Sequence, residues 1–334
     1  MPGWLEQVDG RVERWYAACS GQPSMQPSFQ RGPQPGDVVD GQYVIRERIG
    51  HGGMGCVFLA DQPALERSVA IKFPHPELLD NHDLPDLARR VHQEAMLAFR
   101  VQDPHCVAVF DWGTLPDGTP YLVMDHVPGR PLGRILGDEP VPLMRAIDLF
   151  DQVLAAIAAA HRSGILHGDV KTDNFLVEAI DGTDHVTLID FGLAEEIDAP
   201  PRSELEHGEV VISGTPDYMA PEVIGGDPPS PASDLYGAGV ILYELLTGTT
   251  PFSGSTAMEI MLRHARDEVT PPSQRRPDRG IPPALDDVVL KALEKRPEAR
   301  FYDAAAFARE LHAAAQAAAS WIRSMAPALS LIHI

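Results

Sequence analysis

The stretch from His167 to Asn174 reads His-Gly-Asp-Val-Lys-Thr-Asp-Asn and carries the strongest evidence for the fold. An Asp-Phe-Gly triplet begins at Asp190, sixteen residues after Asn174. Asp169 can accept the proton of an attacking hydroxyl, and Lys171 can steady a phosphate in transfer. Asn174 and Asp190 supply hard oxygen ligands of the kind that magnesium prefers. These spacings predict a site for phosphoryl transfer.

The composition excludes several functional classes. With 334 residues and 44% hydrophobic content, the chain can bury a large core, and we expect two lobes or domains. The net charge of −21 argues against nucleic-acid binding, which needs clustered Lys and Arg. The chain has four Lys, and two of them, Lys72 and Lys171, lie inside motifs. This placement favours a chemical role for both.

The cysteines and the apolar runs predict a cytoplasmic location. Cys19, Cys56 and Cys106 form an odd count without metal-ligand spacing, which is typical of a reducing compartment. The N-terminus lacks the basic and apolar regions of a signal peptide. No apolar run reaches the roughly 18 residues that span a bilayer, so we expect no membrane segment.

The hydrophobic pattern separates three regions. Residues 1–36 begin with an approximate helical stripe and end in a Pro- and Gly-rich linker. Period-two runs predict strands at 43–49, 55–61, 68–73, 107–112 and 121–124. Helical patterns cover 84–100, 143–163, 231–247, 255–266, 284–294 and 303–320. We therefore expect an α+β fold with a β-rich lobe over about 37–125 and a helical lobe over about 128–316. The remaining tail, 317–334, is interpreted as truncated or artefactual sequence.

A glycine-rich turn marks the nucleotide side. Residues 50–57 match G-x-G-x-x-G-x-V, a pattern that also occurs in dinucleotide-binding turns. Here both flanks are strand-like, and glycines let such a turn close over phosphates. Lys72 ends the run Val-Ala-Ile-Lys on the next strand and needs a partner if buried. Glu94 on the following helix is the expected partner, with Asp86 as an alternative.

With these motifs, the chain resembles the eukaryotic-like serine/threonine protein kinases of bacteria over roughly residues 37–316. Three later motifs support the resemblance: 214–222 (Gly-Thr-Pro-Asp-Tyr-Met-Ala-Pro-Glu), 233–239 (Ser-Asp-Leu-Tyr-Gly-Ala-Gly) and 296–301 (Arg-Pro-Glu-Ala-Arg-Phe). The resemblance implies a two-lobed protein kinase-like fold, ATP and Mg²⁺ (or Mn²⁺) as cofactors, and protein substrates. It leaves the oligomeric state open.

The resemblance also implies roles for individual residues. The catalytic residues would be Asp169, Lys171 and Thr215, and the metal ligands Asn174 and Asp190. The nucleotide would be bound by Ile49, Gly50, Gly52, Gly53, Gly55, Val57, Ala70, Lys72, Glu94, Met124, Asp125 and Val127. By the same pattern, Glu222 pairs with Arg300, Asp234 braces the backbone near His167, and Thr215 bridges Asp169 and Lys171. Lys171 and Thr215 are typical of kinases that phosphorylate Ser or Thr.

Gly168 departs from the family pattern. Most members carry an Arg there, which binds a phosphate on the activation segment. The corresponding segment, 193–219, holds seven acidic residues, with Arg202 as its one fixed cation. Apart from Tyr218, its hydroxyl side chains are Ser203, Ser213 and Thr215. We therefore expect an enzyme that is not switched on by phosphorylation of this segment.

Two alternatives remain at this level. His-Gly-Asp also occurs in small-molecule phosphotransferases of related fold, including antibiotic and choline kinases, but these lack the 214–222 motif that forms a docking surface for a polypeptide. A pseudokinase scaffold is the other alternative. It is disfavoured because Lys72, Asp169, Asn174 and Asp190 are all present.

Overall fold

A computed structural model describes residues 33–52, 55–75, 84–136, 141–197, 205–206, 209–210 and 214–329. The chain forms two compact units: a first unit of residues 1–99 and 108–126, and a second unit of 100–107 and 127–334. The first is built mainly of strands and the second mainly of helices, which confirms the predicted α+β class. The N-terminal helical stripe, Gly53, Ser203 and Ser213 lie outside the described residues.

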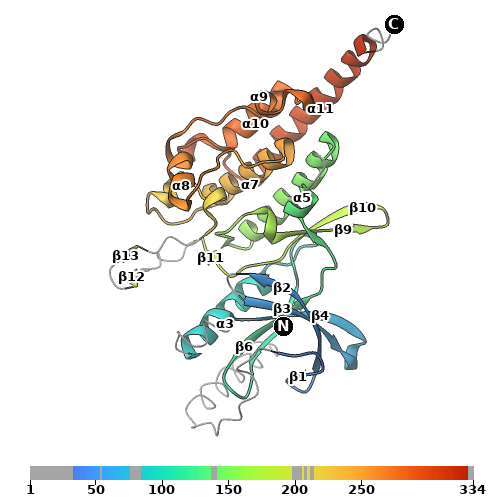
Figure 1. Cartoon of the computed structure of the whole chain (residues 1–334), viewed down its shortest axis with the longest axis vertical. Helices are drawn as coiled ribbons and strands as arrows, with labels where there is room; N and C mark the ends of the chain where they lie inside the picture. The colour runs from blue at the N-terminus through green and yellow to red at the C-terminus, as the bar shows by residue number, and fades with distance from the viewer. Residues whose placement is uncertain are drawn as a thin grey trace. The chain divides into compact units, whose positions relative to one another are not determined.

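The first unit is built on one antiparallel sheet with strand order β1-β2-β3-β4-β6-β5 (Figure 1). Its strands are β1 (Val38–Val39), β2 (Tyr43–Gly52), β3 (Gly55–Gln62), β4 (Arg67–Phe73), β5 (Val109–Thr114) and β6 (Pro120–Asp125). Alternate side chains of a strand face opposite sides, and the buried cluster that includes Phe58, Ile71, Phe73 and Val123 fills one side. The other side carries Val57, Ala70, Met124 and the side chain of Lys72.

Among the predicted strand and helix limits that differ from the structure are those of β5 and of the last helix. β5 begins at Val109 and not at Val107, because the Val107 N–H donates to the Leu188 carbonyl within the second unit. The last helix continues to Leu329, well past residue 320. Its alanine-rich sequence extends the helix without a Gly or Pro stop signal before Pro327.

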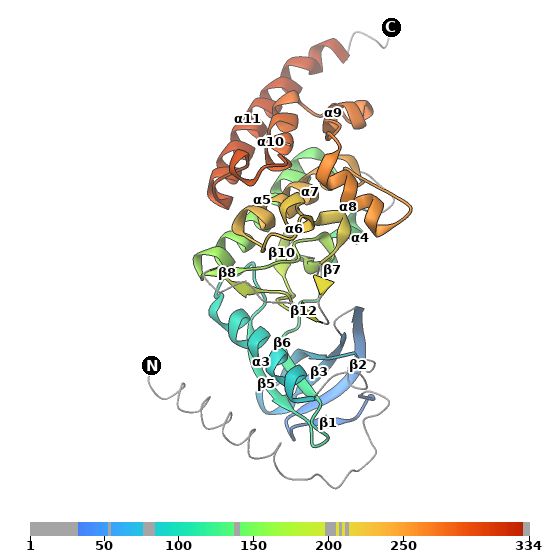
Figure 2. The same ribbon diagram turned by 90° about the vertical axis from the view of Figure 1, so that its left-hand side faces the viewer.

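Helix α3 (Leu84–Arg100) runs alongside this sheet (Figure 2), and the short turn η1 (Pro63–Leu65) links β3 to β4. Leu87, Ala88, Ala95 and Ala98 are buried and recur at helical spacing, which defines the apolar face of α3. This orientation sets which acidic side chain of the helix can reach β4.

The second unit is mainly helical. Its helices are α4 (Leu132–Ile135), α5 (Leu143–Arg162), α6 (Pro221–Ile224), α7 (Pro231–Thr247), α8 (Ala257–Arg266), α9 (Pro272–Arg275), α10 (Pro283–Ala292) and α11 (Ala304–Leu329). Helix α7 is buried along most of its length and packs against α5 and α10 (Figure 1). A capping box between Ser230 and Ser233 starts α7, and Gly248 ends it in the left-handed conformation. Asp234 lies in the first turn of this helix and is buried.

Short strands and turns of the second unit carry the candidate catalytic residues. The strands are β7 (Arg130–Pro131), β8 (Ile165–Leu166), β9 (Phe175–Ile180), β10 (Thr183–Leu188), β11 (Glu195–Glu196), β12 (Leu205–Glu206) and β13 (Glu209–Val210). The 3₁₀ turns are η2 (Thr172–Asn174), η3 (Pro216–Tyr218), η4 (Pro277–Arg279) and η5 (Pro297–Ala299). Hairpin β9–β10 is paired from Phe175 opposite Leu188 onward. Its open end therefore brings Asn174 next to the segment that leads to Asp190.

None of the helices in the described part of the chain is long and apolar enough to cross a bilayer. The cytoplasmic location stays a prediction.

Candidate active site

The buried carboxylate of Asp234 holds the loop from His167 to Asp169 in place. Asp234 on α7 accepts hydrogen bonds from the backbone N–H of His167 at 2.9 Å and of Gly168 at 3.0 Å, which confirms the predicted brace. It also lies 2.8 Å from His161 Nε2 at the end of α5. Burial raises the pKa of Asp234, but the hydrogen bonds from His161 and the backbone outweigh it and hold this pKa below its usual value. The brace is therefore a charged carboxylate.

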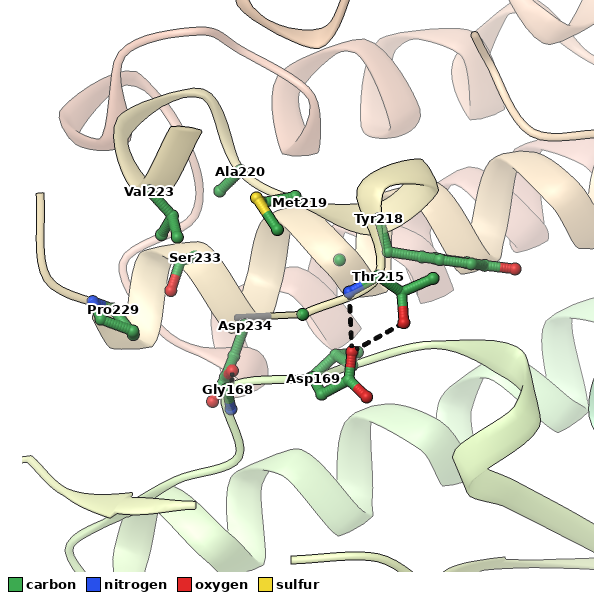
Figure 3. Close-up of a pocket in the computed structure, with 13 residues that line it drawn as sticks. Gly168, Asp169, Thr215, Tyr218, Met219, Ala220, Val223, Pro229, Ser233 and Asp234 are labelled. Carbon is green, nitrogen blue, oxygen red and sulfur yellow. Dashed lines mark hydrogen bonds between the residues drawn. The ribbon is translucent and has the colours of Figure 1, made fainter. Parts of the chain in front are cut away.

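Asp169, Lys171 and Thr215 form one hydrogen-bonded group, and Figure 3 shows the two bonds between Asp169 and Thr215. Lys171 Nζ lies 2.5 Å from Asp169 Oδ2 and 2.8 Å from Thr215 Oγ1. Asp169 Oδ1 accepts from Thr215 Oγ1 at 3.0 Å and from its backbone N–H at 3.2 Å. Thr215 therefore bridges the carboxylate and the ammonium as predicted. The arrangement suits a carboxylate that takes a hydroxyl proton beside a cation that stabilises phosphate charge.

The two predicted metal ligands lie at the open end of hairpin β9–β10. Asn174 Nδ2 donates to the Asp169 carbonyl at 2.8 Å, which turns Oδ1 of the amide away from that loop. The Ile189 N–H donates to the Asn174 carbonyl at 3.0 Å and places Asp190 directly beyond it. The described residues hold no cluster of three or more His, Cys, Asp or Glu at metal-binding distances. An amide oxygen with one carboxylate fits magnesium, which takes its other ligands from water and phosphates.

Gly168 occupies a backbone conformation that explains its residue type. Its φ is +78°, in the left-handed region that L-residues other than glycine adopt at a cost. A Cβ on this residue would lie 2.7 Å from the Leu193 carbonyl oxygen, closer than real Cβ contacts. Glycine therefore relieves strain at the residue before Asp169.

A cavity adjoins Asp169 in the second unit (Figure 3). Thr215, Met219, Ala220 and Val223 line one side of it, and Asp234 and Gly168 line another. The 214–222 motif thus lies beside the carboxylate that we expect to act as the base.

Lys72 and Glu94 form the expected ion pair in the first unit. Lys72 Nζ lies 2.7 Å from Glu94 Oε1, and both side chains are 12% exposed. The alternative partner, Asp86, instead binds Arg89 and Arg90 on its own helix. Asp86 and Glu94 are eight residues apart, about 12 Å along the helix. The position of the helix along the strand therefore decides which of the two carboxylates Lys72 can reach.

The register of the sheet places the predicted nucleotide-binding residues on the same face. Val57 lies opposite Lys72 on the neighbouring strand, and Ala70 lies opposite Met124. Ala70 and Lys72 are two residues apart, so their side chains share a face. Gly50 lies opposite Val57 and extends the same row. The buried aromatic cluster, with Phe58 and Phe73, fills the opposite face.

Three of the remaining predicted residues of this group, Gly52, Gly55 and Asp125, lie at strand ends. A Cβ on Gly55 would lie 2.0 Å from the Phe73 carbonyl oxygen, so only glycine fits there. Ile49 and Gly52 belong to β2, and Gly53 is outside the described residues. The Asp125 N–H donates to the Ala108 carbonyl at 2.8 Å. Val127 belongs to the second unit.

Sequence reasoning missed the contacts of three polar side chains close to the catalytic loop, residues 167–174. Thr172, which directly follows Lys171, contacts Tyr218, and Tyr218 contacts Glu244 on α7. His161 was missed as well. Hydrogen-bond partners 46, 26 and 73 residues apart leave no pattern that a single sequence displays.

The protein kinase domain family matches residues 43–312. The chain belongs to this family. It is 37% identical over 280 residues to the serine/threonine-protein kinase pkn3 of Myxococcus xanthus, covering 83% of this chain and 51% of that protein. It is 38% identical over 274 residues to the serine/threonine-protein kinase PknB of Mycobacterium leprae, covering 81% of this chain and 42% of that protein. The kinase chain thus spans about half, or less, of the length of these curated relatives.

A solved structure supports the kinase fold. A double mutant of the PknI kinase domain of Mycobacterium tuberculosis matches with a TM-score of 0.64 and 25% identity, over 85% of this chain and 99% of that one. The predicted protein kinase-like fold and the resemblance to bacterial serine/threonine kinases are thereby confirmed. In general, members of this family use ATP with a divalent metal ion and phosphorylate proteins.

Proposed function

We propose that this chain transfers the γ-phosphate of ATP to Ser or Thr side chains of protein substrates. The hydrogen-bonded group of Asp169, Lys171 and Thr215 is the observation that carries the proposal. A small aliphatic hydroxyl can approach Asp169, and the 2.8 Å contact between Lys171 and Thr215 is of the kind expected for Ser/Thr transfer. The 214–222 segment beside Asp169 supports a polypeptide as the acceptor.

In the proposed reaction, Asp169 takes the proton of the acceptor hydroxyl as its oxygen bonds to the γ-phosphorus. The bond from that phosphorus to the bridging oxygen of ADP breaks at the same step, and ADP leaves. Lys171 stabilises the charge that develops on the transferring group. Lys72, oriented by Glu94, would hold the α- and β-phosphates. Asn174 and Asp190 would hold magnesium, which supplies charge neutralisation for the phosphates.

ATP turnover with purified protein tests this proposal. We expect Mg²⁺-dependent phosphorylation of itself or of an added protein such as casein, with phosphate recovered on Ser and Thr. Asp169→Asn is an isosteric change that removes the base, and we expect it to lower kcat at least about 100-fold. Equal rates for the mutant and the wild type would indicate a pseudokinase scaffold. Transfer to choline or an aminoglycoside, but not to protein, would favour a small-molecule phosphotransferase.

We also propose that phosphorylation of the activation segment does not switch this kinase on. Gly168 provides no cation to receive a phosphate. The start of the segment is anchored without one, because β11 pairs with β8 and the Ile197 N–H donates to the Gly164 carbonyl at 2.9 Å. Arg100 and Glu196 form an ion pair at the same place. These contacts favour a segment whose first residues are ordered in the unphosphorylated chain.

Phosphatase treatment tests the regulatory proposal. We expect treated and untreated enzyme, and Ser203→Ala, to have kinase rates within about twofold of each other, since no phosphate-dependent charge pair is formed. A loss of tenfold or more after treatment would contradict it. Asp169→Asn, expressed and treated in parallel, controls for contaminating kinases.

A further inference from the structure

The hydroxyl of Thr172 connects the catalytic loop to α7. Thr172 Oγ1 lies 2.9 Å from Tyr218 Oη, which lies 2.5 Å from Glu244 Oε2. Tyr218 has one hydroxyl hydrogen and donates it in the hydrogen bond to the Glu244 carboxylate. Thr172 is therefore the donor in its bond to Tyr218. Thr172 is 2% exposed, which removes competition from water. The three side chains form a partly buried chain of hydrogen bonds.

The bond from Thr172 to Tyr218 adds a second point of attachment between two segments that Asp169 and Lys171 already join at Thr215. Lys171 Nζ bonds Thr215 Oγ1 at 2.8 Å, and the next residue, Thr172, bonds Tyr218. Thr215 and Tyr218 belong to one turn, closed by a bond from the Tyr218 N–H to the Thr215 carbonyl at 3.0 Å. Bonds at Thr215 alone would leave the two segments free to pivot about that residue. Two links at consecutive residues fix their relative orientation.

Thr172 also begins the turn that ends in Asn174. Turn η2 runs from Thr172 to Asn174, and the Asn174 N–H donates to the Lys171 carbonyl at 3.1 Å. A shift of Thr172 would therefore move Lys171 on one side and Asn174 on the other. Its side chain controls groups that we expect to touch phosphate and metal.

Gly133 on α4 provides an independent sign that the hydroxyl orientation matters. A Cβ on Gly133 would lie 2.9 Å from Thr172 Oγ1, closer than real Cβ contacts. A side chain there would turn the hydroxyl away from Tyr218. Because Gly133 has no side chain, it leaves room for the Thr172 rotamer that forms the hydrogen bond to Tyr218.

The acidic surroundings of Glu244 increase the need for donors. Burial raises the pKa of Glu244, and the charges of Asp173 and Asp217 raise it further. The hydrogen bond from Tyr218 acts in the opposite direction. Without the Thr172 donor, Tyr218 would lose the bond that orients its hydroxyl group toward Glu244.

We propose that the Thr172 hydroxyl is a positioning group for phosphoryl transfer, which holds Lys171 and Asp169 in their working orientation through Tyr218 and Glu244. The inference rests on the proposed kinase activity. It predicts a loss in kcat without a matching change in the KM for ATP, because the nucleotide-binding residues of the first unit are untouched.

Three variants test the role of the hydroxyl in steady-state assays. Thr172→Val keeps the shape and removes the donor, and we expect kcat to fall about tenfold while the KM for ATP stays within twofold. Thr172→Ser keeps the donor and should stay within twofold of the wild type. Gly133→Ala, which displaces the hydroxyl without removing it, should reproduce the loss. A kcat for Thr172→Val equal to the wild type, or an equal loss in Thr172→Ser, would overturn the proposal.

A double-mutant cycle in urea unfolding tests the contact without turnover. Thr172→Val and Tyr218→Phe should be non-additive, since each removes the same bond. Additive effects would show that the bond is absent in solution and would overturn the proposal. Absence of turnover in the wild type would overturn the kinase activity and the positioning role together. Normal turnover that Thr172→Val leaves unchanged would overturn the positioning role alone.

Discussion

Replacing Glu222 with glutamine takes the counter-charge away from Arg300. The two side chains form a paired contact, with Arg300 Nη1 at 2.7 Å and Nη2 at 2.6 Å from the two carboxylate oxygens. The Arg300 side chain is 0% exposed and that of Glu222 9%. Arg300 also donates to the carbonyls of Ala232, Glu294 and Lys295. Glu222→Gln would therefore leave a guanidinium that is buried and hydrogen-bonded but no longer neutralised.

The expected cost follows from this burial. Removing one partner of a buried ion pair costs about 3–5 kcal/mol of unfolding free energy. The three carbonyl acceptors keep most N–H groups of Arg300 bonded, so we expect the lower end, about 3 kcal/mol. For a unit of this size, that corresponds to a fall in Tm of about 9 °C. Replacing both residues, as Glu222→Leu with Arg300→Met, should recover part of the loss, because no charge is then stranded while the three carbonyls lose their donor.

Thermal unfolding followed by circular dichroism, with urea titration at 25 °C, measures the effect. Glu310→Gln is the matched control, because Lys291 Nζ lies 2.5 Å from Glu310 Oε1 while both side chains are 39–49% exposed. An exposed pair of this kind contributes less than about 1 kcal/mol. A Glu222→Gln variant that loses no more stability than Glu310→Gln would refute the reasoning.

Three further outcomes are expected. Gly168→Ala should lower the free energy of unfolding by about 1–2 kcal/mol, measured by urea titration, because alanine must adopt a left-handed φ there. Burial lowers the pKa of His264 to about 4, so the unfolded state binds the extra proton, and stability should fall by at most about 3 kcal/mol as pH drops from about 6.5 to 4. His264→Gln should remove this contribution to the pH dependence of the urea unfolding midpoint. Glu94→Gln should raise the KM for ATP several-fold by releasing Lys72, whereas Asp86→Asn should not.

Much of the fold could be predicted because its evidence is local. Strand and helix periods are properties of short windows, and the observed limits of α3 and α7 equal the predicted ones. The catalytic loop is also local, since Asp169, Lys171 and Asn174 lie within six residues. Short spacing leaves few ways to arrange such groups.

Long-range contacts set the limit of sequence reasoning. The sequence offered both Asp86 and Glu94 as partners of Lys72, and the choice depends on where α3 lies along β4. Thr172 and Tyr218 are hydrogen-bonded across 46 residues. Such contacts depend on how helices and turns pack, which no local pattern encodes.

The sequence by itself determined the family and the chemical groups of this kinase. Motifs carry this information because each needs particular residue types within a few positions, where glycines, carboxylates and amines are recognisable. The tertiary structure decided which of those groups meet. It selected Glu94 for Lys72, placed Thr215 between Asp169 and Lys171, and put Gly168 in a left-handed conformation. Hydrogen bonds act over about 3 Å, and only the packed chain sets which distant residues come that close.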